Sequence, residues 1–115
     1  MTLDNFIQKL QGTPESIEFS YTMAVIEQHY DFTETEFKNG DLINVAGQNS
    51  GSCKLFAFAQ QQNLSKGQTL ACFGAYYRDD VLKHPDATDH QNIRNFIKNG
   101  WSGISFSNSP LQYKA

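Results

Sequence analysis

The chain has 115 residues, a net charge of −3 and a sequence pI of about 5.5. A chain of this length can bury a core without disulfides or a metal, and we expect one domain over residues 1–115. The acidic balance and the absence of a Lys/Arg run exclude the basic face that nucleic-acid binding requires.

The first residues and the cysteines indicate an intracellular protein. The N-terminus lacks the basic start and long apolar core of a secretory signal, and no stretch approaches the roughly 18 apolar residues of a membrane span. A secreted disulfide scaffold would carry more cysteines than Cys53 and Cys72. We therefore expect reduced thiols and no membrane partner.

Apolar residues recur at helical spacing in five segments. They predict helices over residues 3–12, 14–30, 53–62, 66–77 and 89–99. Thr2 caps the first and Ser52 the third, whose run from Leu55 to Ala59 predicts a buried, central helix. Gly100 ends the fifth helix. Three capping boxes fit the pattern, at Thr33-x-x-Glu36 for a single turn, Ser65-x-x-Gln68 and Thr88-x-x-Gln91.

Two short segments predict strands. Residues 42–45 are β-branched and follow a turn at residues 39–41, and residues 101–106 alternate, with Ile104 and Phe106 on one face. We expect these two segments to pair, and the tail from residue 108 to 115 to be frayed. The fold class is therefore α+β, with mostly short helices packed around a central apolar helix and a small two-stranded β element.

The polar loop that leads into the third helix is the first candidate site. It contains Asn49, Ser52, Cys53 and Lys54, and a helix start exposes unpaired N–H groups beside a positive dipole end. That field favours a bound anion, and it would also lower the pKa of a Cys53 thiol for catalysis with a histidine. The structural alternative is that Ser52 is only an N-cap and Cys53 a small core residue.

The second candidate is the start of the fifth helix. His90 and Arg94 lie four residues apart and share one helix face, and Asp89 lies beside them. Histidine with arginine is a common anion-binding or acid–base pairing, although a solvated helix start has the same composition.

Tyr77 and Arg78 are the third candidate. With Tyr76 they form either a ligand wall or a pair of core tyrosines whose hydroxyls find nearby partners. The chain has no CxxC or HExxH motif and no GxSxG elbow, so we expect no metal and no cofactor.

Several segments resemble the HopJ type III effector family across nearly the whole chain. They are GSCK-x-FAFA at residues 51–59, YYR-x-DVL at 76–82 and DH-x-NIRNF at 89–96, followed by Gly100-Trp101. The resemblance implies a bacterial cytoplasmic protein that, as an effector, would be translocated into a host cell through a type III secretion system. It implies no particular reaction and no catalytic residues.

We therefore expect a surface that joins residues 47–54 to the start of the fifth helix and binds a small anionic ligand, or a host or bacterial protein partner. The alternatives are a small cysteine-dependent hydrolase or transferase that uses Cys53 and His90, and a non-catalytic structural module. The sequence gives neither the ligand nor the oligomeric state. The candidate ligand-binding residues are Asn49, Ser52, Lys54, Tyr77, Arg78, Asp89, His90 and Arg94.

Overall fold

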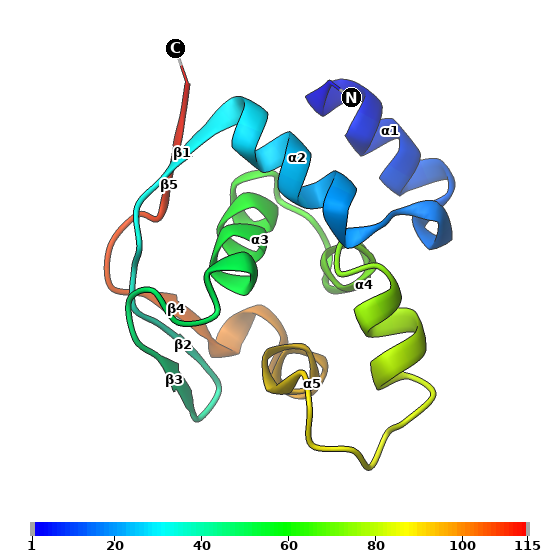
Figure 1. Ribbon diagram of the computed structural model, residues 1–115, viewed down its shortest axis with the longest axis vertical. Coiled ribbons are helices and arrows are strands. Elements are labelled where there is room, and N and C mark those ends of the chain that lie inside the picture. Colours follow the sequence, from blue (N-terminus) through cyan, green and yellow to red (C-terminus); the bar gives the residue numbers. More distant parts are fainter. Residues whose placement is uncertain (1, 115) are drawn as a thin grey trace.

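The α+β class is confirmed by a computed structural model, which describes residues 2–114. Figure 1 shows short helices packed against one another, with the strands gathered on one side. The α-helices are α1 (Leu3–Gly12), α2 (Phe19–His29), α3 (Ser50–Gln61), α4 (Lys66–Ala71) and α5 (Gln91–Asn99). Shorter helical turns are η1 (Pro14–Ser16), η3 (Gly100–Gly103) and a π-helix, η2 (Tyr76–Val81).

The strands form two small antiparallel sheets. The strands are β1 (Tyr30–Phe32), β2 (Phe37–Asn39), β3 (Leu42–Asn44), β4 (Ile104–Phe106) and β5 (Leu111–Tyr113). One sheet has the order β3-β2-β4, and the other pairs β1 with β5. Phe37 of β2 stands opposite Asn44 on one side and Phe106 on the other. The two predicted strands thus share a sheet, but β2 separates them.

The helices α1 and α4 begin where local sequence signals place them. The Thr2 hydroxyl accepts a hydrogen bond from the Asn5 amide at 3.1 Å. Ser65 and Gln68 form the complete capping box at the start of α4. These side chains satisfy amide groups that have no partner within the helix.

The core is formed by one cluster of buried apolar side chains. Helix α3 contributes six buried residues, which are Cys53, Leu55, Phe56, Ala57, Phe58 and Ala59. Phe56 lies 5.0 Å from Phe96 of α5 and 5.5 Å from Phe73, between ring centroids. Phe56 of α3 therefore contacts both α5 and the turn that follows α4.

The predicted helix over residues 14–30 is wrong near its start, because α2 begins only at Phe19. Ile17 and Glu18 are extended and separate η1 from α2. The side chain of Ile17 is fully buried, and its carbonyl accepts a hydrogen bond of 2.8 Å from the Arg78 guanidinium. A long-range contact thus replaces the helical hydrogen bond at this position.

The predicted fourth helix is also too long, because Gly74 interrupts it. Gly74 has a φ of +63°, and a Cβ there would lie 2.7 Å from the Phe19 amide nitrogen. Only glycine combines that backbone conformation with so close an approach. The chain then resumes as the π-helix η2.

Three further predictions on the strands and their neighbours are wrong. Residues 33–36 form no helical turn, since the Thr33 amide donates to the Pro110 carbonyl at 2.8 Å and β2 follows. Residues 100–103 are helical, so the last predicted strand begins only at Ile104. The tail is not frayed up to residue 114, because Leu111 is 2% exposed and β5 pairs with β1.

Candidate functional site

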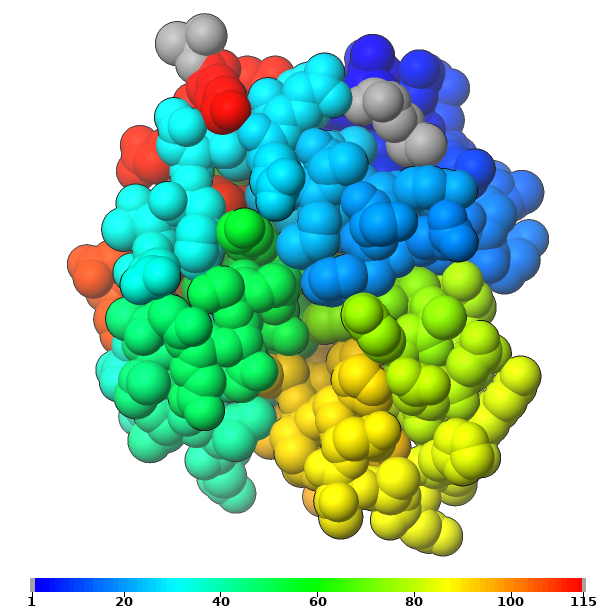
Figure 2. All heavy atoms as spheres, in the orientation of Figure 1, coloured from blue at the N-terminus to red at the C-terminus, as the bar shows by residue number. Residues whose placement is uncertain are grey.

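A pocket of about 500 Å³ lies between four segments of the chain that are distant in sequence. Figure 2 views the face on which these segments meet, coloured blue, green, yellow-green and yellow. Its apolar lining consists of Phe19, Leu42, Phe73, Tyr76 and Ile93. Its polar lining consists of Asn49, Gly51, Ser52, His90, Gln91 and Asn92. The loop before α3 and the start of α5 thus meet around one cavity.

Helix α3 begins earlier than predicted. Its N-cap is Asn49 in the left-handed conformation, with φ of 53°, and Ser52 lies in the first turn. The side chain of Asn49 does not cap the helix, because its amide group donates to Asn44 Oδ1 at 2.7 Å. No side chain among residues 2–114 caps this helix. Its first backbone N–H groups, which lie beside the pocket, therefore donate to no capping side chain.

Helix α5 repeats this arrangement. Its N-cap is His90, with φ of 51°, so the predicted cap at Thr88 is wrong. The side-chain amide of Gln91 instead donates to the backbone carbonyl of Thr88 at 2.5 Å. In the described part of the chain α5 also lacks a side-chain cap. The uncapped starts of α3 and α5 therefore line the same pocket. Helix α2, whose first residue Phe19 also lines it, has no side-chain cap among the described residues but carries the acidic Glu18 at its N-cap, whereas α1 and α4 are capped.

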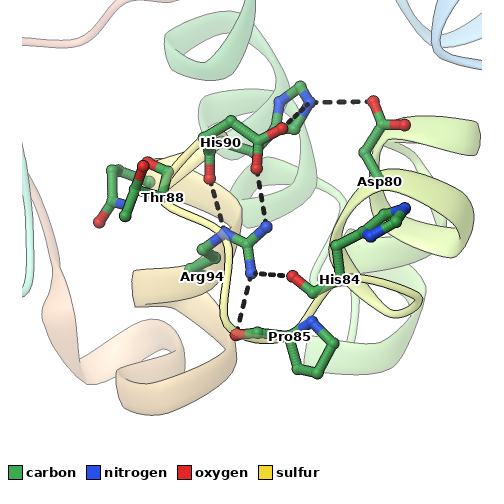
Figure 3. A network of polar contacts seen from close by, with 8 residues as sticks. Asp80, His84, Pro85, Thr88, His90 and Arg94 are labelled. Carbon is green, nitrogen blue, oxygen red and sulfur yellow. Dashed lines mark hydrogen bonds and ion pairs between the residues drawn. The ribbon is translucent and has the colours of Figure 1, made fainter.

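His90 is oriented by the π-helix η2. Its Nε2 lies 3.0 Å from Asp80 Oδ2, and its ring lies 5.1 Å from the ring of Tyr76. Asp80 and Tyr76 are four residues apart in η2, which is close to one turn of a π-helix, so both face the imidazole. Figure 3 shows the His90 ring pointing toward the Asp80 carboxylate.

Buried asparagines connect the two helix starts. Asn44 and Asn92 exchange hydrogen bonds between their amide groups, at 3.2 and 3.0 Å, and Asn39 donates to Asn92 Oδ1 at 3.0 Å. All three are at most 7% exposed. Since Asn49 also donates to Asn44, this asparagine network runs from the N-cap of α3 to the first turn of α5.

Arg94 holds the loop before α5 rather than facing the pocket. Its guanidinium donates to Asp89 Oδ1 at 2.7 Å and to the carbonyls of Asp89, His84 and Pro85 at 2.6, 3.0 and 3.3 Å (Figure 3). The hydrogen bond from Arg94 lowers the pKa of Asp89 below its ordinary value. His90 thus lines this pocket, whereas Arg94 is not among its lining residues.

Comparison with known proteins now identifies the family. The profile described as HopJ type III effector protein matches residues 3–111. The chain belongs to the HopJ family. The fold is also that of a solved protein described as "unknown function protein VPA0580", with 55% identity, a TM-score of 0.98, and coverage of 99% of this chain and 95% of that one. None of the curated proteins matches the sequence.

Three other predicted ligand residues of this HopJ chain lie outside the pocket lining. Lys54 lies 3.8 Å from Glu27 and over the ring of Phe32 at 5.0 Å. Arg78 is engaged by the Ile17 carbonyl, and Tyr77 packs partly against the core. Of the aromatic pair, Tyr76 lines the pocket.

The thiol chemistry predicted for Cys53 does not fit its surroundings in the HopJ fold. The residue is 1% exposed, and its sulfur faces the Thr35 carbonyl at 3.7 Å. Burial raises the pKa of Cys53 to about 11, which is opposite to the lowered value expected at a helix start. Neither of the two cysteines forms a disulfide, and both are buried.

Within residues 2–114, no group of three or more His, Cys, Asp or Glu side chains is arranged to hold a metal ion. In the same part of the chain, no helix combines the length and hydropathy needed to cross a bilayer.

Sequence reasoning missed several residues of this HopJ site. Phe19 and Phe73 have the spacing of core residues, and nothing in their local sequence separates a pocket wall from a core. Asp80 follows Tyr76 by four residues. This spacing places both side chains on one helix face, but only if residues 76–81 are helical, which the sequence did not predict with certainty. Asn39 lies in a predicted turn, where asparagine is expected for other reasons, and Asn44 lies in a predicted strand with no sign that its side chain is buried.

Proposed function

We propose that this HopJ protein binds a small anionic ligand in the pocket between the starts of α3 and α5. The observation that carries the proposal is that both helices begin at this pocket without a side-chain cap in the described residues. Free N–H groups at a helix start are suited to an anion, because each helix places about half a positive charge there.

The rest of the lining supports a small ligand rather than a large partner surface. The cavity is concave and combines apolar side chains with polar groups that could orient a ligand. A volume of about 500 Å³ is in the range usual for such sites. A protein partner instead of a small ligand is an outcome that the experiment below would reveal.

The test is a titration of the ¹⁵N-labelled protein with acetate, followed by the backbone amide resonances. Acetamide is the matched neutral probe, because it has nearly the shape of acetate without the charge. We expect acetate to shift the amides of residues 50–52 and 91–93. The capped starts of α1 and α4 are internal controls and should stay unchanged. Equal effects of acetamide, or equal shifts at the capped starts, would contradict the proposal.

A variant sharpens the test. Ser52→Asp places a carboxylate in the first turn of α3, where the dipole stabilises it by about 0.3–1 kcal/mol. The same carboxylate about 5 Å from a bound anion repels it by about 3 kcal/mol at an effective dielectric constant of 20. Acetate binding should therefore weaken by about a hundredfold while the thermal midpoint is kept or raised. Ser52→Asn, which adds no charge, should bind acetate nearly as the wild type does.

Membership of the HopJ family supports a second proposal, that the protein acts as a type III effector in a host cell. The test is a fusion to a calmodulin-dependent adenylate cyclase, expressed in bacteria with and without a working type III system. Cyclic AMP in host cells only with the working system is the expected result. No cyclic AMP in either case would overturn the effector role and leave the ligand site unaffected.

A further inference from the structure

The apolar wall of the pocket is aromatic, and part of it is open. Phe73 is 2% exposed, whereas Tyr76 is 44% exposed and Phe19 is only partly buried. The Phe19 ring packs edge-on against Tyr76 at 5.2 Å and parallel to Phe73 at 6.3 Å, between centroids. Large aromatic surface left open in a concave site is typical of ligand recognition.

The polar wall carries little net charge. No Lys or Arg is among the residues that line the pocket, and the Asp80 carboxylate lies 3.0 Å from His90. The two helix starts together supply a charge of about +1. This electrostatic balance fits a ligand with one negative charge better than a phosphate with nearly two.

We infer that the ligand class is a planar aromatic ring bearing a single carboxylate. The ring contacts Tyr76 and Phe19, and the carboxylate faces the amides at the starts of α3 and α5. The inference rests on the proposed anion site and adds the shape and charge of the ligand. The aromatic part of the ligand is inferred from the exposed surface of Tyr76 and Phe19 in the pocket. This surface is independent of the helix starts, from which the carboxylate is inferred.

Four probes separate the parts of this inference. Benzoate is the reference, and each of the others changes one property: benzamide removes the charge, cyclohexanecarboxylate removes the planar ring, and phenyl phosphate raises the charge. Binding is followed by amide resonances at residues 50–52 and 91–93. We expect a dissociation constant of about a millimolar for benzoate, as usual for so small a ligand. Cyclohexanecarboxylate should bind about threefold to tenfold more weakly, as loss of an aromatic contact predicts.

Each outcome decides a different statement. Equal binding of cyclohexanecarboxylate and benzoate would overturn the aromatic ring and leave the anion site standing. Equal binding of benzamide would overturn the anion site itself. Tighter binding of phenyl phosphate than of benzoate would overturn the inference that the ligand carries a single negative charge.

Variants of Tyr76 test the aromatic wall directly. Tyr76→Leu should weaken benzoate about threefold to tenfold and leave cyclohexanecarboxylate nearly unchanged. Tyr76→Phe, which keeps the ring, should bind both as the wild type does. Tyr77→Leu is the matched control, because the neighbouring residue is absent from the pocket lining. Loss of benzoate binding in Tyr77→Leu but not in Tyr76→Leu would overturn the assignment, and far-ultraviolet circular dichroism verifies folding.

Discussion

The asparagine network gives the sharpest prediction about stability. Asn92→Ala removes the side chain that makes three hydrogen bonds, one with Asn39 and two with Asn44. Each such bond contributes about 1 kcal/mol net, and a buried group left without a partner costs more. Asn39 still reaches the Asn92 carbonyl at 2.7 Å, and Asn44 Oδ1 still accepts from Asn49. The expected loss in the free energy of unfolding is therefore about 2–3 kcal/mol.

Urea denaturation and thermal melting measure this loss. For a domain of this size, 2–3 kcal/mol corresponds to a fall of about 10 °C in the melting temperature. The matched control is Asn95→Ala, which removes a single partly buried hydrogen bond of 3.0 Å to the Asn39 carbonyl and should cost about 1 kcal/mol or less. If Asn92→Ala cost no more than Asn95→Ala, the network would not hold the two helix starts as argued.

Two further predictions concern titratable groups. Neither thiol of the folded protein should react with iodoacetamide near neutral pH, because burial raises the pKa of Cys53 to about 11 and that of Cys72 to about 12. Both should react in denaturant, and rapid labelling of folded Cys53 would revive the thiol-enzyme hypothesis. Asp89 has a pKa in the folded state below its unfolded value, so its pairing with Arg94 stabilises the protein above about pH 4 and is lost as pH falls through the folded pKa. Asp89→Asn should therefore lower the melting temperature at pH 7, and the difference should vanish in strong acid.

Features set by nearby residues could be predicted from the sequence. The start of α1 at Thr2, the capping box at Ser65 and the end of α5 at Gly100 each depend on side chains or backbone within one turn. The short strands at residues 42–44 and 104–106 were also indicated by their own composition. What decides these elements lies within the window that a pattern covers.

Features set by distant contacts could not be predicted. Strands β2 and β5 have three residues each, and each owes its conformation to a partner far along the chain. The break at Ile17 depends on Arg78, and the end of the fourth predicted helix depends on the approach of Gly74 to Phe19. At both of these breaks a tertiary contact overrides a local helix signal.

The candidate site shows the same division within one cluster of residues. Charge and loop composition indicated which two segments would carry the polar groups, and these segments do line one pocket. They did not indicate which groups stay free there. Arg94 is the strongest candidate in the sequence for binding an anion. Its N–H groups, however, donate hydrogen bonds to loop carbonyls and to the Asp89 carboxylate.

The groups that remain free are backbone amides of α3 and α5, which no search for charged side chains can find. They are free because both N-caps are left-handed residues whose side chains bond elsewhere, Asn49 to Asn44 and His90 to Asp80. A left-handed backbone at a residue other than glycine is energetically unfavourable, so the surrounding contacts must maintain it. The asparagine network and the His90–Asp80 contact supply those contacts. The binding capacity proposed for the pocket thus depends on side chains that do not themselves need to touch the ligand.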